Sequence, residues 1–366
     1  MLHLCQACPY RSGNRGAGQY YANGTIGLID SAICFDARAV FRRAAAVAKT
    51  RRAVVAGSCV NLAESVSHGA TIGRDRDAVK NGAARAVSEC LFRAAVAAIV
   101  RCVNQFDENK ASAHLRVALA AASKAAEISR SYYAGNFTVT TKEDMTPVTQ
   151  ADVECEQAIR EIILGAFPEH GFYGEETGRT QGDADYLWLV DPIDGTKGFV
   201  RQYPFFSTQI ALMHHGEIIL GVSSGTMMDE LAWAEKGQGA WLNGQPLRVS
   251  GIDDPDRAAV SVGNLKSLAG SAGWASLGGI VERADRIRGY GDFYHYHLLA
   301  AGKIEAVIES DVNILDIAAL SVIVTEAGGK FTNLNGQKLN LEVRSVLAAN
   351  PSLHAQYLEL LRGYVP

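Results

Sequence analysis

Residues 191–196 read Asp191-Pro-Ile-Asp-Gly-Thr196 and follow the apolar run Tyr186-Leu-Trp-Leu-Val190. The apolar run has the length and composition of a strand, so we expect a strand that ends at Asp191, where the chain must turn. Two carboxylates three residues apart, with Pro192 fixing the backbone between them, can converge on one small volume at the edge of the sheet. Hard oxygen ligands of this kind suit Mg²⁺. The alternative is an Asp-Gly turn in which both aspartates only bend and cap the chain.

The next two residues, Gly195 and Thr196, add a second feature to this turn. Gly195 permits a close approach of the backbone to a ligand. If a helix starts at Gly195-Thr196, its free N–H groups would face a bound phosphate. The stretch therefore predicts one site that metal ions and a phosphate share.

Three other acidic segments occur in matching contexts. Gly174-Glu175-Glu176 follows the strand-like Phe172-Tyr173. Asp316 begins an apolar helix, and Asp152 closes the capping-box sequence that starts at Thr149. Each segment also has a structural interpretation: a solvated turn for the glutamates, an N-cap for Asp316, and a capping box alone for Asp152.

Apolar spacing predicts the elements around these motifs. The stripe of small and apolar residues predicts a long helix that begins at Ala111 and ends before Gly135, and Thr149–Leu164 predicts a second helix. Asn243-Gly244 predicts a hairpin. Helices and hairpins alternate in blocks, which favours stacked α and β layers over a single doubly wound sheet. Strands are expected at residues 172–173, 186–190, 208–213, 217–222, 231–235, 330–331 and 346–349, and a buried helix at 317–327.

The first 107 residues differ in composition from the rest of the chain. They carry 14 Lys and Arg against 7 Asp and Glu, whereas residues 108–366 carry 21 against 32. We expect this basic, Ala- and Arg-rich part to be a poorly ordered or loosely attached extension, either a targeting segment or an upstream reading-frame extension. Cys5 and Cys8 have the CxxC spacing of a zinc site, but no second pair follows, so chance spacing is the better interpretation.

Composition excludes several classes of function. The chain is 48% hydrophobic, enough for a sizeable core. It contains neither an apolar run long enough to span a membrane nor a secretion signal, so we expect a cytoplasmic protein without a membrane partner. A plastid location follows instead if the extension is a transit peptide. The arginines of the extension are scattered without interleaved aromatic residues, which argues against nucleic-acid binding.

Four segments resemble the inositol monophosphatase superfamily in order and spacing, over about residues 108–366. They are Thr146-Pro-Val-Thr149-Gln-Ala-Asp152, Gly174-Glu-Glu176, Asp191-Pro-Ile-Asp-Gly-Thr196, and Asp316-Ile-Ala-Ala followed by Glu326-Ala-Gly-Gly329. Within the superfamily, Asp191-Pro-Ile-Asp-Gly-Thr-Lys-Gly-Phe199 and Gly289-Tyr-Gly-Asp-Phe293 look most like the histidinol-phosphatase branch. One departure is Ile314-Leu315, where relatives usually place a Trp directly before the aspartate. This departure loosens a packing detail and leaves the ligand intact.

The resemblance implies a layered αβαβα sugar-phosphatase fold and a Mg²⁺-dependent site. It makes Glu175, Asp191 and the Ile193 carbonyl the ligands of one Mg²⁺. Asp191, Asp194 and Asp316 would hold a second Mg²⁺, and Glu175 would also border a third, weaker ion. Metal ions at such a site lower the pKa of bound water and neutralise the phosphoryl oxygens and the departing alkoxide.

The resemblance also assigns a catalytic set, which consists of Asp152, Glu175 and Thr196. In the family mechanism, a water activated between the metals and the Thr196 hydroxyl attacks phosphorus in line, while Asp152 orients Thr196. A cysteine nucleophile is unnecessary, so Cys155 is interpreted as a packed core thiol.

Two further acidic residues, Asp292 and Glu309, are expected at the substrate end of the pocket. Glu309 lies seven residues before Asp316, where family members position a substrate-contacting carboxylate, and Asp292 lies in the branch-specific segment. Two carboxylates there would suit a substrate with an ammonium and an imidazole. The alternatives are a solvated helix start for Asp292 and a strand-end charge for Glu309. His295 and His297 are interpreted as helix-surface or packing residues, because Mg²⁺ prefers oxygen. The expected substrate-binding residues are Gly195, Thr196, Asp292, Glu309 and Asp316.

L-Histidinol phosphate is therefore the leading substrate, hydrolysed to L-histidinol and phosphate in histidine biosynthesis by an expected homodimer. The first alternative is another phosphatase of the superfamily, acting as an inositol monophosphatase or as a 3′(2′),5′-bisphosphate nucleotidase. An alternative of another class is a metal-binding regulatory protein that has lost turnover. The presence of every expected acidic ligand, together with Thr196, argues against that alternative.

Overall fold

The computed structural model describes residues 111–135, 139–141, 147–180 and 184–361. The chain divides into two units, Met1–Val87 and Ser88–Pro366, and every described element belongs to the second. The expected extension and the Cys5–Cys8 pair lie outside the described residues, so the boundary at residue 107 stays a prediction. Within the described ranges, no helix combines the length and apolarity that crossing a membrane requires.

Two long helices form the first layer. Helix α4 (Ala113–Tyr133) and helix α5 (Gln150–Ala166) pack against each other. Helix α4 also packs against strands β6 (Ser207–His214) and β7 (Glu217–Gly225), and α5 against strand β5 (Tyr186–Asp194). Both have the small and apolar stripe that predicts them, and Leu115 and Ile159 on these stripes are fully buried. The two predicted helices are therefore confirmed, each to within two residues at either end.

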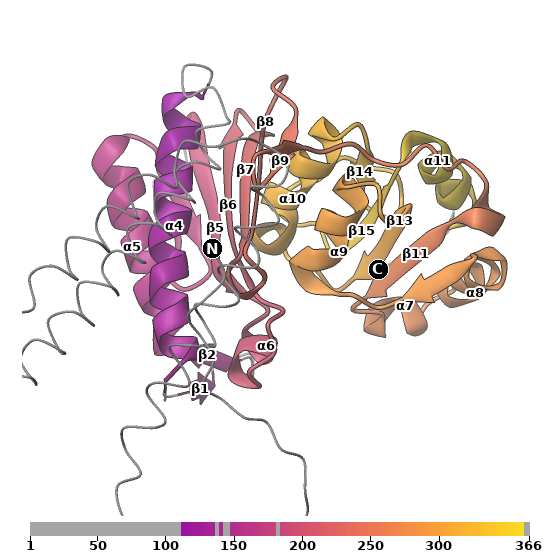
Figure 1. Ribbon diagram of the computed structural model, residues 1–366, viewed down its shortest axis with the longest axis horizontal. Coiled ribbons are helices and arrows are strands. Elements are labelled where there is room, and N and C mark those ends of the chain that lie inside the picture. The colour runs from indigo at the N-terminus through magenta and orange to yellow at the C-terminus, as the bar shows by residue number, and fades with distance from the viewer. Residues whose placement is uncertain (1–110, 136–138, 142–146, 181–183, 362–366) are drawn as a thin grey trace, which may run out of the picture. The chain divides into compact units, whose positions relative to one another are not determined.

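An eight-stranded sheet lies beneath these helices, with the order β10-β9-β8-β7-β6-β5-β3-β4 (Figure 1). Its neighbouring strands are antiparallel except for the parallel pair β3 and β5. The predicted hairpin at Asn243-Gly244 is confirmed, because both residues have the positive φ of such a turn and join β9 to β10. The strands are β3 (Gly171–Gly174), β4 (Gly178–Thr180), β5 (Tyr186–Asp194), β6 (Ser207–His214), β7 (Glu217–Gly225), β8 (Glu230–Glu235), β9 (Ala240–Leu242) and β10 (Gln245–Pro246).

Helices α9 (Asp292–Ala300) and α10 (Ile314–Glu326) form the middle layer. Helix α10 contacts β5, β6, β7, β8 and β9 of the large sheet and strand β14 (Lys330–Thr332) of the second sheet. Helix α9 contacts β7 and strand β13 (Ala306–Ser310). Consecutive residues of α10 from Ile317 to Val324 are buried, because sheets cover the helix on two sides. A helix that is apolar on every side is typical of such an interior position.

The second sheet has five strands in the order β12-β11-β13-β15-β14, and α8 (Gly273–Arg283) and α11 (Pro351–Leu360) belong to the outer layer (Figure 1). The predicted layered αβαβα fold is confirmed. Its strands are β11 (Ala259–Gly263), β12 (Arg286–Arg288), β13 (Ala306–Ser310), β14 (Lys330–Thr332) and β15 (Ser345–Ala349); the short elements are β1 (Val139–Thr141), β2 (Pro147–Thr149), α6 (Thr196–Val200), α7 (Lys266–Ala269) and two 3-10 turns (Thr226–Met228, Pro255–Arg257).

Two predicted boundaries differ from the structure. Strand β5 does not end at Asp191 but continues to Asp194. Helix α10 begins at Ile314, before Asp316, because the Asn313 side chain accepts a hydrogen bond from the N–H of Leu315 and caps the helix. Asp316 is thus the third residue of the helix, and its interpretation as the N-cap is wrong.

Candidate active site

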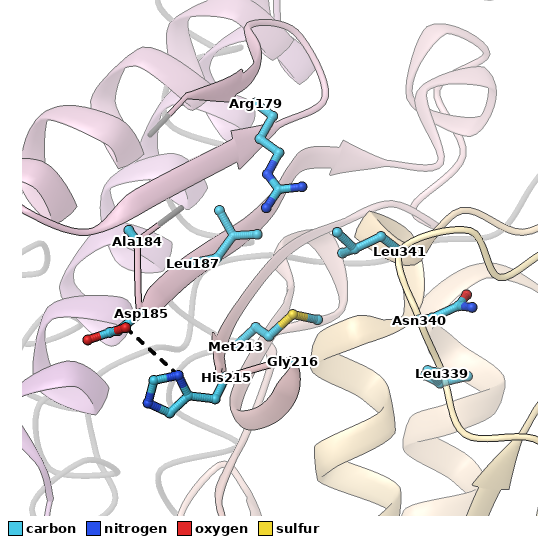
Figure 2. A pocket seen from close by; sticks show the side chains of 10 residues that line it. All are labelled: Arg179, Ala184, Asp185, Leu187, Met213, His215, Gly216, Leu339, Asn340 and Leu341. Carbon is cyan, nitrogen blue, oxygen red and sulfur yellow. Dashed lines mark ion pairs between the residues drawn. The ribbon is translucent and has the colours of Figure 1, made fainter. Parts of the chain in front are cut away.

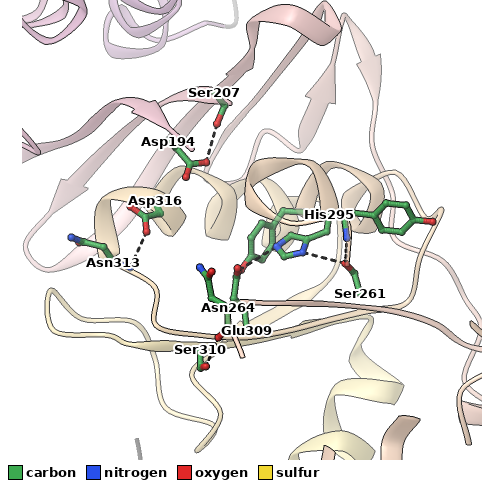
Figure 3. Close-up of polar contacts among 11 residues, drawn as sticks. Asp194, Ser207, Ser261, Asn264, His295, Glu309, Ser310, Asn313 and Asp316 are labelled. Carbon is green, nitrogen blue, oxygen red and sulfur yellow. Dashed lines mark hydrogen bonds and ion pairs between the residues drawn. The ribbon is translucent and has the colours of Figure 1, made fainter. Parts of the chain in front are cut away.

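Three aspartates meet where the end of β5 faces the first turn of α10. Carboxylate oxygens of Asp191, Asp194 and Asp316 all lie within 4.8 Å of one another. Figure 3 shows Asp194 and Asp316 together. Asp194 accepts a hydrogen bond from the Ser207 hydroxyl, and Asp316 accepts one from the backbone N–H of Asn313. The structure therefore brings together three side chains that the sequence predicts as metal ligands, although 122 positions separate Asp194 from Asp316.

A bulge in β5 explains how two of these aspartates reach one site. Asp191 is paired with Gln209 of β6 and Asp194 with Ser207, so three steps along β5 match two steps along β6. On a regular strand, residues three apart point to opposite faces. The extra residue shifts this alternation by one and lets both carboxylates turn to the same side. Pro192 lies inside the bulge, where its missing N–H disrupts no regular ladder.

The crowded carboxylates have pKa values above their ordinary range. Burial raises the pKa of Asp191, and the negative charges of Glu175, Asp194 and Asp316 raise it further. Burial also raises the pKa of Asp194, with added repulsion from Asp292 and Asp316. Burial raises the pKa of Asp316 to about 7, although the Asn313 N–H opposes the shift. A divalent cation bound by these hard oxygens would offset the repulsion, so the donor set fits Mg²⁺.

Glu175 reaches the same region from the end of β3. Its N–H donates to the Val190 carbonyl oxygen at 3.2 Å, which ties the segment after β3 to β5. The charge of Glu175 also contributes to the raised pKa values of Asp191, Asp316 and Asp152. Glu175 is therefore close enough to Asp191, Asp316 and Asp152 to act electrostatically on them.

Glu156, which sequence reasoning missed, holds the segment that follows Glu175. Its side chain is almost fully buried on α5, and its two oxygens accept hydrogen bonds from the N–H groups of Glu176 at 2.7 Å and Thr177 at 2.8 Å. A carboxylate that accepts two backbone N–H groups fixes the path of that backbone. The signal in the sequence was a charged residue on the buried stripe of a helix.

Ile193, Thr196 and Asp152 form a second group beside the aspartates. The Ile193 N–H donates to Oδ1 of Asp191 at 3.0 Å, and its carbonyl accepts from the Thr196 hydroxyl at 3.1 Å. Thr196 Oγ1 also lies 3.4 Å from Oδ1 of Asp152. The other oxygen of Asp152 accepts from the N–H and the hydroxyl of Thr149, at 2.8 and 2.6 Å. The predicted capping box is present, and it orients Asp152 toward Thr196.

Gly195 lies between the aspartates and α6. It has φ of 89°, in the left-handed region, and a Cβ atom at this position would lie 2.8 Å from the Phe205 carbonyl oxygen. Only glycine fits this backbone without strain. Helix α6 begins at the next residue, Thr196, so the predicted helix start is confirmed.

A narrow cavity of about 20 Å³ contains the expected substrate-end carboxylates and two of the aspartates. Glu309 is buried on β13, accepts a hydrogen bond from the Tyr296 hydroxyl at 2.7 Å, and lies 3.2 Å from Nε2 of His295. Asp292 is exposed at the first turn of α9. Asn264, missed from sequence, belongs to the same wall. The lining residues are Asp194, Asn264, Asp292, Tyr296, Glu309, Val312, Asp316, Ile317 and Leu320.

The two histidines of α9 are buried and pack in the interior, which confirms the packing alternative of their interpretation and excludes the helix-surface alternative. His295 Nδ1 lies 3.2 Å from the Ser261 hydroxyl, and His297 Nδ1 lies 2.8 Å from Glu230. Neither histidine belongs to the group of metal-ligating side chains found among the described residues. Cys155 is a buried thiol whose pKa burial raises to about 12, in agreement with its predicted role in the core.

A larger hollow of about 390 Å³ lies elsewhere on the fold and contains none of the predicted site residues. Figure 2 shows its lining, with Asp185 and His215 facing each other at a distance of 3.8 Å. Its walls mix aliphatic side chains with one exposed ion pair. The narrower cavity beside Asp194 and Asp316 combines converging carboxylates with raised pKa values and is therefore the better candidate for chemistry.

Comparison with known proteins places this chain in a family. Residues 111–365 match the model of the inositol monophosphatase family. The chain is 36% identical over 261 residues to a histidinol-phosphatase of Mycobacterium tuberculosis, covering 68% of this chain and 98% of the relative. It is also 36% identical over 225 residues to an inositol-1-monophosphatase of Caulobacter vibrioides, covering 59% of this chain and 87% of the relative.

Solved structures agree with the sequence relatives. The extragenic suppressor protein suhB of Bartonella henselae superposes with a TM-score of 0.64 at 30% sequence identity, covering 69% of this chain and all of that chain. The family match spans both sheets, the middle helices and every residue of the site described above. The chain belongs to the inositol monophosphatase family and is a phosphatase of that family.

Proposed function

We propose that the domain formed by residues 108–366 is a Mg²⁺-dependent hydrolase of L-histidinol phosphate, which it converts to L-histidinol and phosphate. The observation that carries the proposal is the convergence of Asp191, Asp194 and Asp316 beside the hydrogen-bonded pair of Thr196 and Asp152. The first group supplies ligands for divalent cations. The second supplies a hydroxyl that can orient a water molecule.

The proposed metal ligands divide into two overlapping sets. Glu175, Asp191 and the Ile193 carbonyl would hold one Mg²⁺, and Asp191, Asp194 and Asp316 a second. Bound Mg²⁺ would lower the pKa of the attacking water and neutralise negative charge on the phosphate. All donors are oxygens, which Mg²⁺ prefers.

Thr196 and Asp152 would orient the attacking water. Thr149 occupies one oxygen of Asp152, so the other oxygen remains directed at Thr196. The Thr196 hydroxyl donates its hydrogen to Asp152 or to Ile193, and its lone pairs can accept a hydrogen from water. Gly195 lets the backbone approach the phosphate closely.

Charge at the substrate end favours a cationic substrate. Asp292 and Glu309 line the cavity next to Asp194, and Glu309 is buried. An ammonium and an imidazolium would be attracted by these carboxylates, whereas inositol phosphate brings no positive charge. The second phosphate of an adenosine bisphosphate would be repelled there. The histidinol-phosphatase relative supports the same choice.

A substrate panel tests this assignment. With Mg²⁺ present, kcat/KM should be highest for L-histidinol phosphate, lower for inositol 1-phosphate and lowest for adenosine 3′,5′-bisphosphate. A preference for either competitor would reject the histidinol assignment and retain the phosphatase assignment. Failure to release phosphate from any of the three would favour the regulatory alternative.

We also propose that residues 1–107 are dispensable for catalysis, because every proposed site residue lies after residue 150. A chain that begins at Glu108 should stay soluble and keep kcat within a few fold of the full chain; an insoluble or inactive product would show that the boundary is wrong.

We expect a homodimer, and light scattering that gives the mass of one chain would contradict this. Fluorescent fusions of the full chain and of the truncated chain test whether the protein locates to the cytoplasm or to a plastid.

A further inference from the structure

A continuous series of hydrogen bonds connects Asp194 at the end of β5 to Glu230 at the start of β8. Ser207 Oγ donates to Oδ2 of Asp194 at 3.0 Å (Figure 3), and Gln209 Nε2 donates to Ser207 Oγ at 2.7 Å. The same amide nitrogen donates to Ser223 Oγ at 3.0 Å. The residues beyond Asp194, called here the Glu230 chain, are, in order, Ser207, Gln209, Ser223, His297 and Glu230.

The outer half of the Glu230 chain runs from β7 through α9 to β8. Ser223 Oγ lies 2.9 Å from Nε2 of His297, and Nδ1 of His297 lies 2.8 Å from Oε2 of Glu230. The side chain of Glu230 is 17% exposed, whereas His297 and Ser223 are buried. Buried polar groups that lose a partner cost free energy, so the hydrogens of this chain have little choice of direction.

The charge of Glu230 determines that direction at the outer end. An ionised carboxylate only accepts hydrogen bonds, so Nδ1 of His297 must carry a hydrogen. In neutral His297 the other ring nitrogen, Nε2, then accepts and must receive the hydroxyl hydrogen of Ser223. The oxygen of Ser223 is consequently left to accept from the amide of Gln209.

The amide orientation of Gln209 determines the direction of the hydrogen bond between Ser207 and Asp194. With its NH₂ group between the two serines, it donates to both, so the Ser207 hydroxyl hydrogen points at Asp194. If the amide were turned over, its carbonyl oxygen would accept from both serines, and the lone pairs of Ser207 would face the Asp194 carboxylate. With His297 neutral, the orientation that Glu230 and His297 impose on Ser223 excludes that alternative.

We propose that the Glu230 chain is a positioning device that guarantees Asp194 a hydrogen bond from Ser207, holding the carboxylate plane in the orientation that binds the divalent cation. The proposal rests on the proposed function, because it assigns Asp194 as a Mg²⁺ ligand. The five residues act through Asp194 and are positioning residues. Outer hydrogen-bond partners of metal ligands commonly change metal affinity or activity by about 10- to 100-fold.

Glu230→Gln tests the outer end with little risk to folding, because the side chain is partly exposed and the change is isosteric. Nitrogen-15 NMR of the histidines in the Mg²⁺-free protein should show His297 with hydrogen on Nδ1, and a shift toward the other tautomer in the variant. Calorimetric titration with Mg²⁺ alone should show affinity reduced by about 10-fold. At saturating Mg²⁺, KM for L-histidinol phosphate should remain unchanged.

The inner end offers a pair of variants and a control. Ser207→Ala should weaken Mg²⁺ binding by about 10- to 100-fold, and Ser207→Thr, which retains the hydroxyl, should restore most of it. Ser129→Ala is the matched control, since Ser129 is a buried serine on α4 that donates to the Ala126 carbonyl oxygen. Its Mg²⁺ affinity should equal that of the parent.

Distinct results separate failure of this inference from failure of the proposed function. If the parent binds Mg²⁺ and releases phosphate, but Glu230→Gln and Ser207→Ala bind Mg²⁺ as the parent does, the positioning role is wrong and the function stands. If His297 carries its hydrogen on Nε2 in the parent, the inferred direction is wrong. If the parent does not bind Mg²⁺, the proposed function and this inference both fall.

Discussion

The hydroxyl of Thr196 lies 3.4 Å from Oδ1 of Asp152, although 44 positions separate the two residues in the chain. Thr149 holds the other oxygen of Asp152 with two hydrogen bonds, so the start of α5 and the start of α6 are joined at this point. The first turn of one helix therefore orients a hydroxyl on another. That hydroxyl is the proposed partner of the attacking water.

Removing the hydroxyl should affect the chemical step more than substrate binding. Thr196→Val keeps the shape of the side chain and should lower kcat by roughly 10²–10⁴-fold, the range for loss of a positioned proton-transfer partner. Thr196→Ser should retain most of the activity because it keeps the oxygen. Steady-state kinetics with saturating Mg²⁺ measures both. Equal activity in the Val and Ser variants would exclude a role for the hydroxyl.

Asp194 and Asp292 line the same cavity, but replacing each of them should have a different kinetic effect. Asp194→Asn removes a charge proposed to bind metal and should lower kcat by about 10²-fold or more. Asp292→Asn should spare the metals and reduce kcat/KM for L-histidinol phosphate more than for inositol 1-phosphate. Kinetic constants for both esters decide the matter, and an equal loss on both in Asp292→Asn would remove its specificity role.

Glu156 should control metal activation although it lies behind the site. Glu156→Gln keeps the size of the side chain but has only one oxygen for the two N–H groups of Glu176 and Thr177. The Mg²⁺ concentration for half-maximal activity should rise about 10-fold, because the segment after Glu175 loses a fixed path. Glu154→Gln, on the exposed side of the same helix, is the control. Similar activation curves for the two variants would contradict the positioning role of Glu156.

The pKa shifts of the aspartates predict how stability depends on pH and metal. The pKa of Asp316 is raised from 3.8 to about 7, so between these values the folded protein binds more protons than the unfolded chain. The raised pKa of Asp316 therefore contributes to the free energy of unfolding at low pH, and this contribution is lost as pH rises through this window. Asp191 and Asp194 shift in the same direction.

Bound Mg²⁺ should restore that stability where the aspartates are ionised. At a concentration about a hundredfold above Kd, it should raise Tm by about 5–10 °C at pH 7.5 and by much less at pH 5. Thermal melts with Mg²⁺ and with EDTA at both pH values provide the measurement. An equal gain at both pH values, or a gain only in acid, would be inconsistent with a cation bound by these carboxylates.

The parts of the fold that sequence predicts well are those with a strong local signal. The stripes of α4 and α5 and the Asn243-Gly244 turn each depend on residues a few positions apart. The second sheet was predicted only at β14 and β15. Strands β13 and β15 are both buried along their whole length and lack the alternation of a half-exposed strand, so periodicity alone does not distinguish such a run from a buried helix.

The site was predictable as a set of residues but not as a geometry. Every proposed metal-binding aspartate could be named from its motif, whereas the bulge at Asp191–Asp194 depends on pairing with β6, which no local pattern reveals. The Glu230 chain is harder still, because 74 positions separate Ser223 from His297 and 67 separate His297 from Glu230. Such contacts exist only once β7, β8 and α9 have packed together.

Release of inorganic phosphate from L-histidinol phosphate, with Mg²⁺ present, removed and restored, tests the central claim most directly. Phosphate should be released with Mg²⁺, stop when EDTA removes the metal, and resume when Mg²⁺ is added back. Asp194→Asn should give little release under the same conditions. Full turnover in EDTA, or unchanged turnover by Asp194→Asn, would contradict a metal-dependent phosphatase at Asp191, Asp194 and Asp316.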